Sequence, residues 1–255
     1  EVYLGNGTDF VTHTCVGAEY LDPSDITATG LVAKFEFDGN LVDSTGLQTA
    51  VATGTLEYKT GKFGSSVKTD GATNYIDLGF KAMRDDYRTP YGISMFIKVD
   101  THIDDVDGIM VQGYLGTSGG YNLLNFTSTD KLTYRELDQT YGGEAAIVDT
   151  IPFPTGEFVH VVLSRTSAGV VSLYVNERLV GTQTAVQGVS DNFNTSIGTM
   201  LYYTSAKRAI EMDHLEVYTR ELTIGDISNL YNAGKTRIPH NQTFTPTFAC
   251  SKDNT

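Results

Sequence analysis

The sequence has no tryptophan, two cysteines and six prolines among its 255 residues. The cysteines, Cys15 and Cys250, are too few for a cysteine-rich zinc site and form no Cys-x-x-Cys pair. No apolar run approaches the roughly 20 residues of a membrane-spanning helix, so we expect no insertion into a membrane. The composition therefore excludes zinc-finger and integral membrane classes.

Basic residues are also scarce. Lys and Arg number 18 against 31 Asp and Glu, and the formal net charge is −13. Such a surface repels phosphate backbones, so we expect no nucleic-acid partner. The sequence lacks phosphate-binding and dinucleotide-binding glycine motifs. Its five histidines show no zinc-binding spacing, and His160 alternates with apolar positions, as a buried and hydrogen-bonded residue of a sheet would.

Glycine is abundant, with 26 residues, and it bounds many short segments of alternating or β-branched apolar residues. These predicted strands are 31–37, 75–80, 92–100, 107–115, 121–126, 131–137, 158–165, 170–182, 195–200 and 209–222. Residues 224–231 have apolar residues at helical spacing, with Thr223 placed to cap the start and Asn232-Ala233-Gly234 to end the helix. We therefore predict an all-β domain over 31–235 with one short C-terminal helix, an N-terminal arm over 1–30 and a C-terminal tail over 236–255.

Five phrases in order resemble the concanavalin A-like lectin/glucanase superfamily in its laminin G-like branch. They are LVAKFEFDGNLVDSTG (31–46), GKFGSSVKTDGATNYIDLG (61–79), GISMFIKVD (92–100), GEFVHVVLSR with VSLYVNERLVGT (156–182), and MDHLEVYTRELTIGDISNLYNAG (212–234). The resemblance covers residues 31–235 and implies a jelly-roll sandwich of two antiparallel sheets. Phe96 and Phe158 stand where the family usually has tryptophan, so no tryptophan is present to stack on a sugar.

Glu211, Asp213 and Glu216 fit the E-x-D-x-x-E pattern of retaining glucanases in this superfamily. There, alternate residues of one bulged strand carry the nucleophile and the acid, with the outer carboxyls about 5 Å apart. Here the pattern falls on the last strand of the predicted sandwich, without aromatic sugar platforms. We therefore interpret it as a structural strand and expect no catalytic residue.

The resemblance also implies a structural calcium ion where the first and last strands neighbour each other. The expected ligands are Asp38 and Asp213, with backbone carbonyls and the turn residues Gly39, Asn40 and Asp43 completing the site. The alternative is an Asx-turn in which Asp38, Asn40 and Asp43 bond their own backbone. Residues Asp104, Asp105 and Asp107 form a second acidic loop, which we interpret as a solvated turn.

Six of the 15 tyrosines fall on or beside the middle predicted strands and their glycine-rich loops, namely Tyr114, Tyr121, Tyr134, Tyr141, Tyr202 and Tyr203. A tyrosine offers a ring that stacks and a hydroxyl that bonds, so these positions predict a ligand surface. The expected set is Tyr114, Tyr121, Tyr134, Arg135, Tyr141 and Tyr202, with Arg135 able to pair with an acidic sugar. The alternative is ordinary sheet aromatics.

The segments outside the sandwich bear on its setting. Because first and last strands adjoin in this family, Cys15 and Cys250 come within reach of each other, and we predict a disulfide, with two free thiols as the alternative. The sequons at Asn6, Asn125, Asn194 and Asn241 permit N-glycosylation and favour an extracellular setting.

Our leading interpretation is a non-enzymatic recognition or adhesion module that binds glycan or protein, secreted or displayed on a virion, filament or cell surface. The rival is a structural decoration or filament subunit whose terminal arms contact copies of itself or a scaffold. A glycan-cleaving enzyme is the third class.

Overall fold

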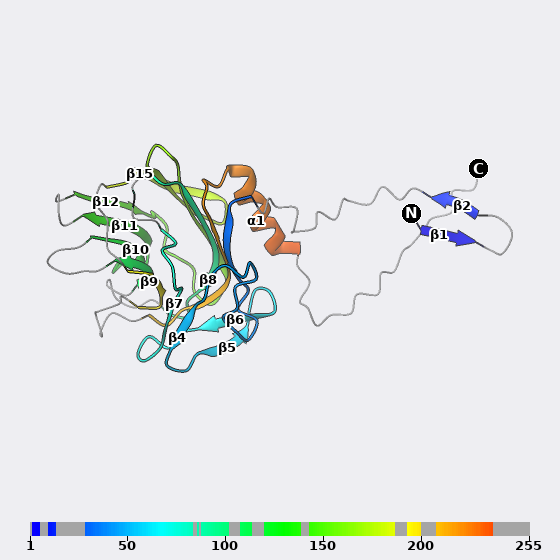
Figure 1. The fold of residues 1–255 in the computed structure, drawn as a ribbon, viewed down its shortest axis with the longest axis horizontal. Coiled ribbons are helices and arrows are strands. Elements are labelled where there is room, and N and C mark those ends of the chain that lie inside the picture. Colours follow the sequence, from blue (N-terminus) through cyan, green and yellow to red (C-terminus); the bar gives the residue numbers. More distant parts are fainter. Residues whose placement is uncertain are drawn as a thin grey trace.

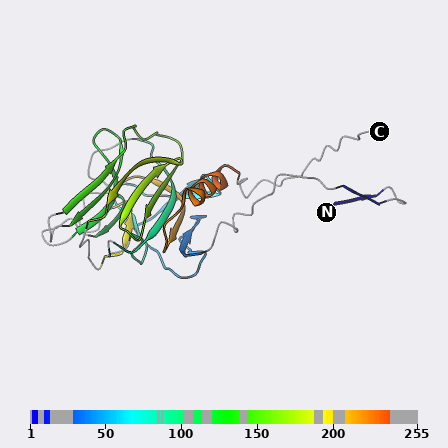
Figure 2. The same ribbon diagram turned by 90° about the horizontal axis from the view of Figure 1, so that it is seen from above.

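The computed structural model describes residues 2–5, 10–13, 29–83, 86, 88–101, 108–113, 120–138, 143–186, 193–199 and 208–236. Its main body is a sandwich of two antiparallel sheets, which Figures 1 and 2 show from two directions. The predicted fold class is therefore confirmed. Within residues 1–30, β1 (Val2–Gly5) and β2 (Phe10–His13) form an antiparallel hairpin that the sequence analysis did not anticipate.

One sheet has seven strands in the order β12-β11-β10-β9-β16-β7-β4. Their bounds are β4 Val51–Thr53, β7 Tyr75–Asp77, β9 Gly108–Gly113, β10 Gly120–Phe126, β11 Leu132–Asp138, β12 Gly143–Val148 and β16 Thr195–Ile197. We call this layer the seven-stranded sheet. The short strand β4 escapes period-2 analysis because three residues show hardly one full alternation, whereas β16 falls within the predicted strand 195–200.

The other sheet has eight strands in the order β15-β14-β13-β8-β17-β6-β5, with β3 paired to β17 off this path. Their bounds are β3 Leu31–Phe35, β5 Glu57–Thr60, β6 Ser65–Lys68, β8 Tyr91–Lys98, β13 Val159–Arg165, β14 Val170–Val175, β15 Arg178–Thr184 and β17 Glu211–Tyr218. The predicted run 170–182 divides into β14 and β15 at Asn176 and Glu177, whose φ angles of 47° and 66° suit a tight hairpin turn.

The core lies between the two sheets. Alternate residues of β8 face it, namely Ile93, Met95 and Ile97, and Leu124 and Phe126 of β10 belong to the same buried cluster. On β17 the inward residues are Met212, Leu215 and Val217, so the alternation skips one position. His214 adopts a φ of 53° at that point, and the register with β8 shifts there, which identifies a β-bulge.

The single helix in the described residues, α1 (Ile224–Thr236), lies against the outer face of the eight-stranded sheet (Figures 1 and 2). Its Ile227 and Leu230 pack with Val162, Tyr218 and Leu222. Its predicted start is confirmed, because Thr223 Oγ1 accepts a hydrogen bond from Asp226 N at 3.2 Å. Its predicted end is wrong: the helix continues past Gly234, which lies inside it and does not form a left-handed cap.

Candidate functional site

The three carboxylates of the E-x-D-x-x-E pattern lie on β17 and point away from the core. Glu211 and Asp213 precede the bulge and Glu216 follows it, so the bulge keeps all three on the outer face of the sheet. That placement agrees with a glucanase arrangement. Their surroundings do not, because all three residues are buried, Glu211 to 2% exposure and Asp213 to 0%.

Each outer carboxylate is already paired. Glu211 lies 3.0 Å from Lys98 Nζ and 3.4 Å from Lys68 Nζ. Glu216 contacts His214 Nε2 at 3.0 Å and accepts a hydrogen bond from the Tyr218 hydroxyl. Burial alone would raise the pKa of Glu216, but these hydrogen bonds and the charge of His214 lower it to about 2. Glu216 is therefore ionised at neutral pH and holds no proton to give to a leaving group.

A short loop, residues 61–65, closes over Asp213. Phe63 N donates a hydrogen bond to Asp213 Oδ2 at 2.8 Å. Gly61 lets the loop approach this closely, because a Cβ at that position would lie 2.6 Å from the same oxygen. The middle carboxylate of the pattern thus serves to hold a loop, and a sugar has no access to it.

The expected calcium residues divide into two groups. Asp43 accepts hydrogen bonds from Lys34 N, Thr45 N and Oγ1, Leu47 N and Gln48 N. Asn40 Oδ1 accepts one from Val42 N at 2.8 Å, beside the exposed Gly39. Asn40 and Asp43 therefore make the contacts of the alternative interpretation, in which the turn bonds its own backbone, and a metal ion at either residue stays a prediction.

Asp38 and Asp213 do meet at one feature, the loop 61–65. Asp38 Oδ1 accepts a hydrogen bond from Ser65 N at 2.6 Å, while Asp213 accepts from Phe63 N. Among the described residues, no cluster of three or more His, Cys, Asp or Glu side chains is arranged to hold a metal. Calcium at Asp38 and Asp213, completed by backbone carbonyls, stays a prediction.

Tyr134 does not belong to a ligand surface, and that prediction is wrong. Its side chain points between the sheets and is fully buried. Its hydroxyl lies 2.9 Å from the Tyr91 hydroxyl, 2.8 Å from Glu136 Oε1 and 3.1 Å from Asn122 Oδ1. Thr133 and Arg135, the neighbours of Tyr134 on β11, face outward instead, because side chains alternate along a strand.

Tyr121 and Arg135 lie on the outward face of the seven-stranded sheet. Leu137 is the cross-strand partner of Tyr121, and Leu123 is the partner of Arg135. Tyr121 is buried in a small apolar cluster with Val111 and Leu123. Arg135 is partly exposed and its Nη2 lies 2.6 Å from Glu144 Oε1. The remaining expected ligand residues, Tyr114, Tyr141 and Tyr202, lie outside the described residues.

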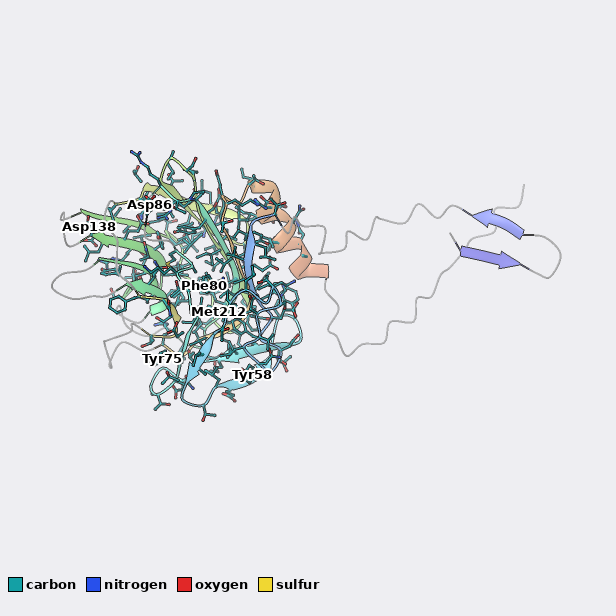
Figure 3. All side chains as sticks on the ribbon, in the orientation of Figure 1. Tyr58, Tyr75, Phe80, Asp86, Asp138 and Met212 are labelled. Atoms are coloured by element: carbon teal, nitrogen blue, oxygen red, sulfur yellow. The ribbon has the colours of Figure 1, made fainter. Side chains whose placement is uncertain are left out.

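Strand register continues this outward face across the whole sheet. The row of directly opposed residues runs Ala146, Arg135, Leu123, Val111, Ser196, Asp77 and Val51, from β12 to β4. We call it the outward row. Its middle is buried, while Ala146 and Arg135 at one end and Asp77 and Val51 at the other reach solvent. Figure 3 labels Tyr75 near the β4 end of this sheet and Asp138 near the β12 end.

The β4 end of the outward row carries exposed polar side chains that no sequence pattern identified. Tyr75 is partly exposed beside Thr53, its partner on β4, and Asn194 Nδ2 lies 3.4 Å from Asp77 Oδ2. The sequence predicts a strand over 75–80 but does not tell which face Tyr75 occupies. The pairing of β4 with β7 places Tyr75 on the outward face, together with Asp77.

The sequons and cysteines have different outcomes. Asn125 is buried on β10, so glycosylation there is wrong for the folded chain. Asn194 is partly exposed, and its glycosylation stays a prediction. Asn6, Asn241, Cys15, Cys250 and the acidic loop residues Asp104, Asp105 and Asp107 lie outside the described residues. In the part of the chain that the structure covers, no helix has the length and apolarity to cross a membrane.

Comparison with known families agrees with this architecture. A laminin G-type family model, described as the concanavalin A-like lectin/glucanases superfamily, matches residues 70–228, more than half of the chain. The chain belongs to this superfamily. No curated protein matches the sequence.

Solved structures of this superfamily's fold resemble the chain at low identity. Domain 4 of AbnA, an extracellular arabinanase from Geobacillus stearothermophilus solved with arabinotriose, is 20% identical over 79% of this chain and 98% of its own, with a TM-score of 0.63. The binding domain of Paraclostridial Mosquitocidal Protein 1 is 15% identical over 83% of this chain and 53% of its own, with a TM-score of 0.64. The Trypanosoma rangeli sialidase is 17% identical over 83% of this chain and 34% of its own, also with a TM-score of 0.64.

These likenesses establish the shared fold. The chain spans about half the length of the mosquitocidal-protein domain and about a third of the sialidase. The match covers 98% of the arabinanase domain, which is itself one domain of a larger enzyme.

Proposed function

We propose that this chain is a non-catalytic carbohydrate-recognition module that works outside the cell. The observation that carries the proposal is the burial of the E-x-D-x-x-E carboxylates, with Asp213 under loop 61–65 and Glu211 between two lysines. A retaining glycosidase needs one protonated and one free carboxyl facing a sugar. Glu211 is held by two lysines, and Glu216 is ionised and buried, so neither is available for those roles.

The fold supports the carbohydrate part of the proposal. The arabinanase domain that shares it was solved with arabinotriose, and the mosquitocidal-protein domain is described as a binding domain. In this chain the outward row offers the matching chemistry at its β12 end. Arg135 presents a guanidinium whose exposed ion pair with Glu144 is weak enough to exchange for a ligand carboxylate or hydroxyls.

The proposal is tested by binding and turnover measured on the same preparation. We expect the protein to bind a subset of glycans on an array, with acidic sugars among them, and to hydrolyse no arabinan, β-glucan or sialoside. Arg135→Ala should weaken glycan binding about tenfold, which corresponds to about 1.4 kcal/mol, because it removes a charged donor.

Arg178→Ala is the matched control. Arg178 also forms a 2.6 Å ion pair, with Asp149, but on β15 of the other sheet, and its side chain is similarly exposed. Glycan binding should be unchanged in this variant. Equal losses in both variants would remove the outward row as the binding face. Hydrolysis that Glu211→Gln abolishes would make the protein an enzyme.

A further inference from the structure

An exposed apolar patch surrounds the edge strand β4. Val42 is 66% exposed, Leu47 64% and Val51 58%, three of the most exposed large apolar residues in the described part of the chain. Val42 is bridged to Thr49, so these two side chains share one side of the strand. Val51 lies two residues beyond Thr49 and points the same way, because side chains alternate along an extended chain.

The patch is rigid. The carboxylate of Asp43 accepts five hydrogen bonds, including those from Lys34 N, Leu47 N and Gln48 N, which hold the turn that carries Val42 and Leu47. The pKa of Asp43 is lowered, since these hydrogen bonds outweigh the opposing effect of burial. The backbone that carries Val42 and Leu47 is therefore already held in place, so less conformational entropy is lost when a partner binds.

Among the described residues, no strand pairs with the outer edge of β4 itself, and only Thr49, just before β4, is bridged to Val42. β4 is the last strand of the seven-stranded sheet, and all three of its residues are exposed. Proteins usually guard such an edge with lysine, other charges or proline. Residues 44–56, which include β4, contain no charged residue and no proline, in a chain where 19% of residues are charged. This edge is open to another β-strand.

The charge of the chain indicates which strand pairs there. Two copies that each carry a net charge of −13 repel each other, and this repulsion is least where they meet at an uncharged surface such as residues 44–56. The strand that this edge accepts should be short, neutral and β-branched, and Val51-Ala52-Thr53 is such a strand. An antiparallel pair of identical strands is related by a twofold axis, so the patch is complementary to itself.

We propose that two copies of this chain form a dimer by antiparallel pairing of β4 with β4, sealed by Val42, Leu47 and Val51. Antiparallel edge pairing continues the sheet, with the twofold axis perpendicular to it. Both outward rows then face the same side of one sheet that is twice as wide. If the outward row binds glycan, as in the proposed function, the dimer presents two sites to one surface and gains avidity.

The dimer is tested by sedimentation of the full chain over a wide range of concentration, without ligand. We expect a reversible dimer that added salt strengthens, because salt screens the repulsion between the two acidic copies. Val51→Lys places a charge at the edge and should weaken dimerisation at least about tenfold. Leu47→Asp should do the same from outside the strand, which covers the case in which Val51→Lys disturbs β4.

Leu179→Lys is the matched control. Leu179 is 50% exposed on β15, the edge strand of the other sheet, and its replacement should leave the dimer intact. Circular dichroism confirms folding of each variant. A parent chain that stays monomeric at every concentration, or a dimer that survives both Val51→Lys and Leu47→Asp, overturns the proposal, as does dissociation caused by Leu179→Lys.

Avidity is measured separately from dimerisation. On a densely glycosylated surface the parent should bind at least about tenfold more tightly than Leu47→Asp, whose substitution lies outside the outward row, while both bind the same soluble monovalent sugar equally. If the protein dimerises but binds no glycan, the β4 interface is supported and the proposed function is wrong. If parent and variant bind the dense surface equally, the two outward rows do not face the same side.

Discussion

At the scale of single residues, His160 on β13 has an unusual environment. Its ring lies between Phe96, 4.7 Å away, and Tyr231 of α1, 5.9 Å away. Nε2 is 2.8 Å from Ser94 Oγ, and Nδ1 is buried with no hydrogen-bond partner among the residues that the structure describes. Burial lowers the pKa of His160 to about 3. The imidazole is therefore neutral at physiological pH, and the prediction of a buried sheet residue is confirmed.

This depressed pKa predicts a loss of stability in acid. In the unfolded chain a histidine has a pKa of about 6.5, so between pH 6.5 and 3 the unfolded state binds the proton first. The free energy of unfolding should fall as the pH drops through that window, by up to about 1.4 kcal/mol per pH unit from this residue. Urea unfolding followed by circular dichroism from pH 7 to pH 4.5 measures the slope.

The double variant Ser94→Ala with His160→Phe is the test protein, because it keeps the aromatic stack and leaves no hydroxyl unpaired. Its slope should be shallower than that of the parent. Glu216 and His214, which face the ring from β17, are the same in both proteins, as is the pairing of Glu216 with Lys34. Parallel slopes for the two proteins would show that His160 does not carry the effect.

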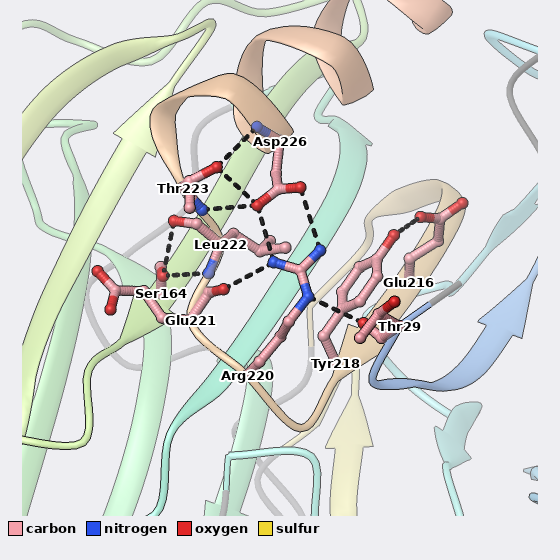
Figure 4. A network of polar contacts seen from close by, with 9 residues as sticks. All are labelled: Thr29, Ser164, Glu216, Tyr218, Arg220, Glu221, Leu222, Thr223 and Asp226. Carbon is pink, nitrogen blue, oxygen red and sulfur yellow. Dashed lines mark hydrogen bonds and ion pairs between the residues drawn. The ribbon is translucent and has the colours of Figure 1, made fainter. Parts of the chain in front are cut away.

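At the scale of one element, the start of α1 is fixed by a polar network (Figure 4). Asp226 accepts hydrogen bonds from Thr223 N and Oγ1 and forms an ion pair with Arg220 at 2.8 Å. Arg220 also donates to Thr29 O and Glu221 O. The hydrogen bond from Arg220 is the main reason that the pKa of Asp226 is lowered to about 2. The network joins the helix to the chain that enters β3.

Two substitutions separate the parts of this network. Thr223→Ala should cost about 1 kcal/mol of unfolding free energy, as the loss of a helix cap does. Asp226→Ala should cost more, about 2 kcal/mol, because it also leaves Arg220 without its carboxylate. Glu221→Ala, an exposed neighbour, should stay within about 0.5 kcal/mol of the parent. Urea unfolding followed by circular dichroism checks the order, and a larger loss for Thr223→Ala would contradict it.

At the scale of the whole molecule, a polar contact crosses the core and joins the two sheets. Tyr91 belongs to β8 and Tyr134 to β11, and their hydroxyls lie 2.9 Å apart in the interior. Arg165 stacks over Tyr91 with its guanidinium 4.6 Å from the ring centre, and Glu136 accepts from Tyr134 and from Val186 N. Burial raises the pKa of Glu136 and of Tyr134. This contact is structural.

Tyr134→Phe should therefore destabilise the protein without changing its binding. The substitution removes the hydroxyl that Tyr91 and Glu136 share and leaves buried polar atoms unpaired, at a cost of about 1–3 kcal/mol. Its glycan binding below the unfolding transition should match the parent. Phe153→Leu offers a matched change in the same core, with no polar group lost and a smaller effect expected. If the fully folded Tyr134→Phe variant bound glycan more weakly than the parent, Tyr134 would contribute to ligand binding after all.

Local patterns in the sequence were sufficient for the fold class and for most of the long strands. Alternating apolar residues in 92–100, 121–126 and 131–137 predicted β8, β10 and β11, because a strand with one buried face has apolar residues at every second position. Thr223 identified the start of α1, because capping depends on residues adjacent in sequence. The five family phrases identified the superfamily, and the matching family model covers residues 70–228.

Contacts between distant segments decided the rest. Alternation states that Tyr134 and Arg135 face opposite sides of β11, but only the packing of two sheets tells which side is the core. The burial of Asp213 depends on loop 61–65, about 150 residues earlier in the chain, through the hydrogen bond from Phe63 N. The outward row and the open edge at β4 follow from strand order. Strand order is set by the packing of the whole domain, and no window of neighbouring residues contains it.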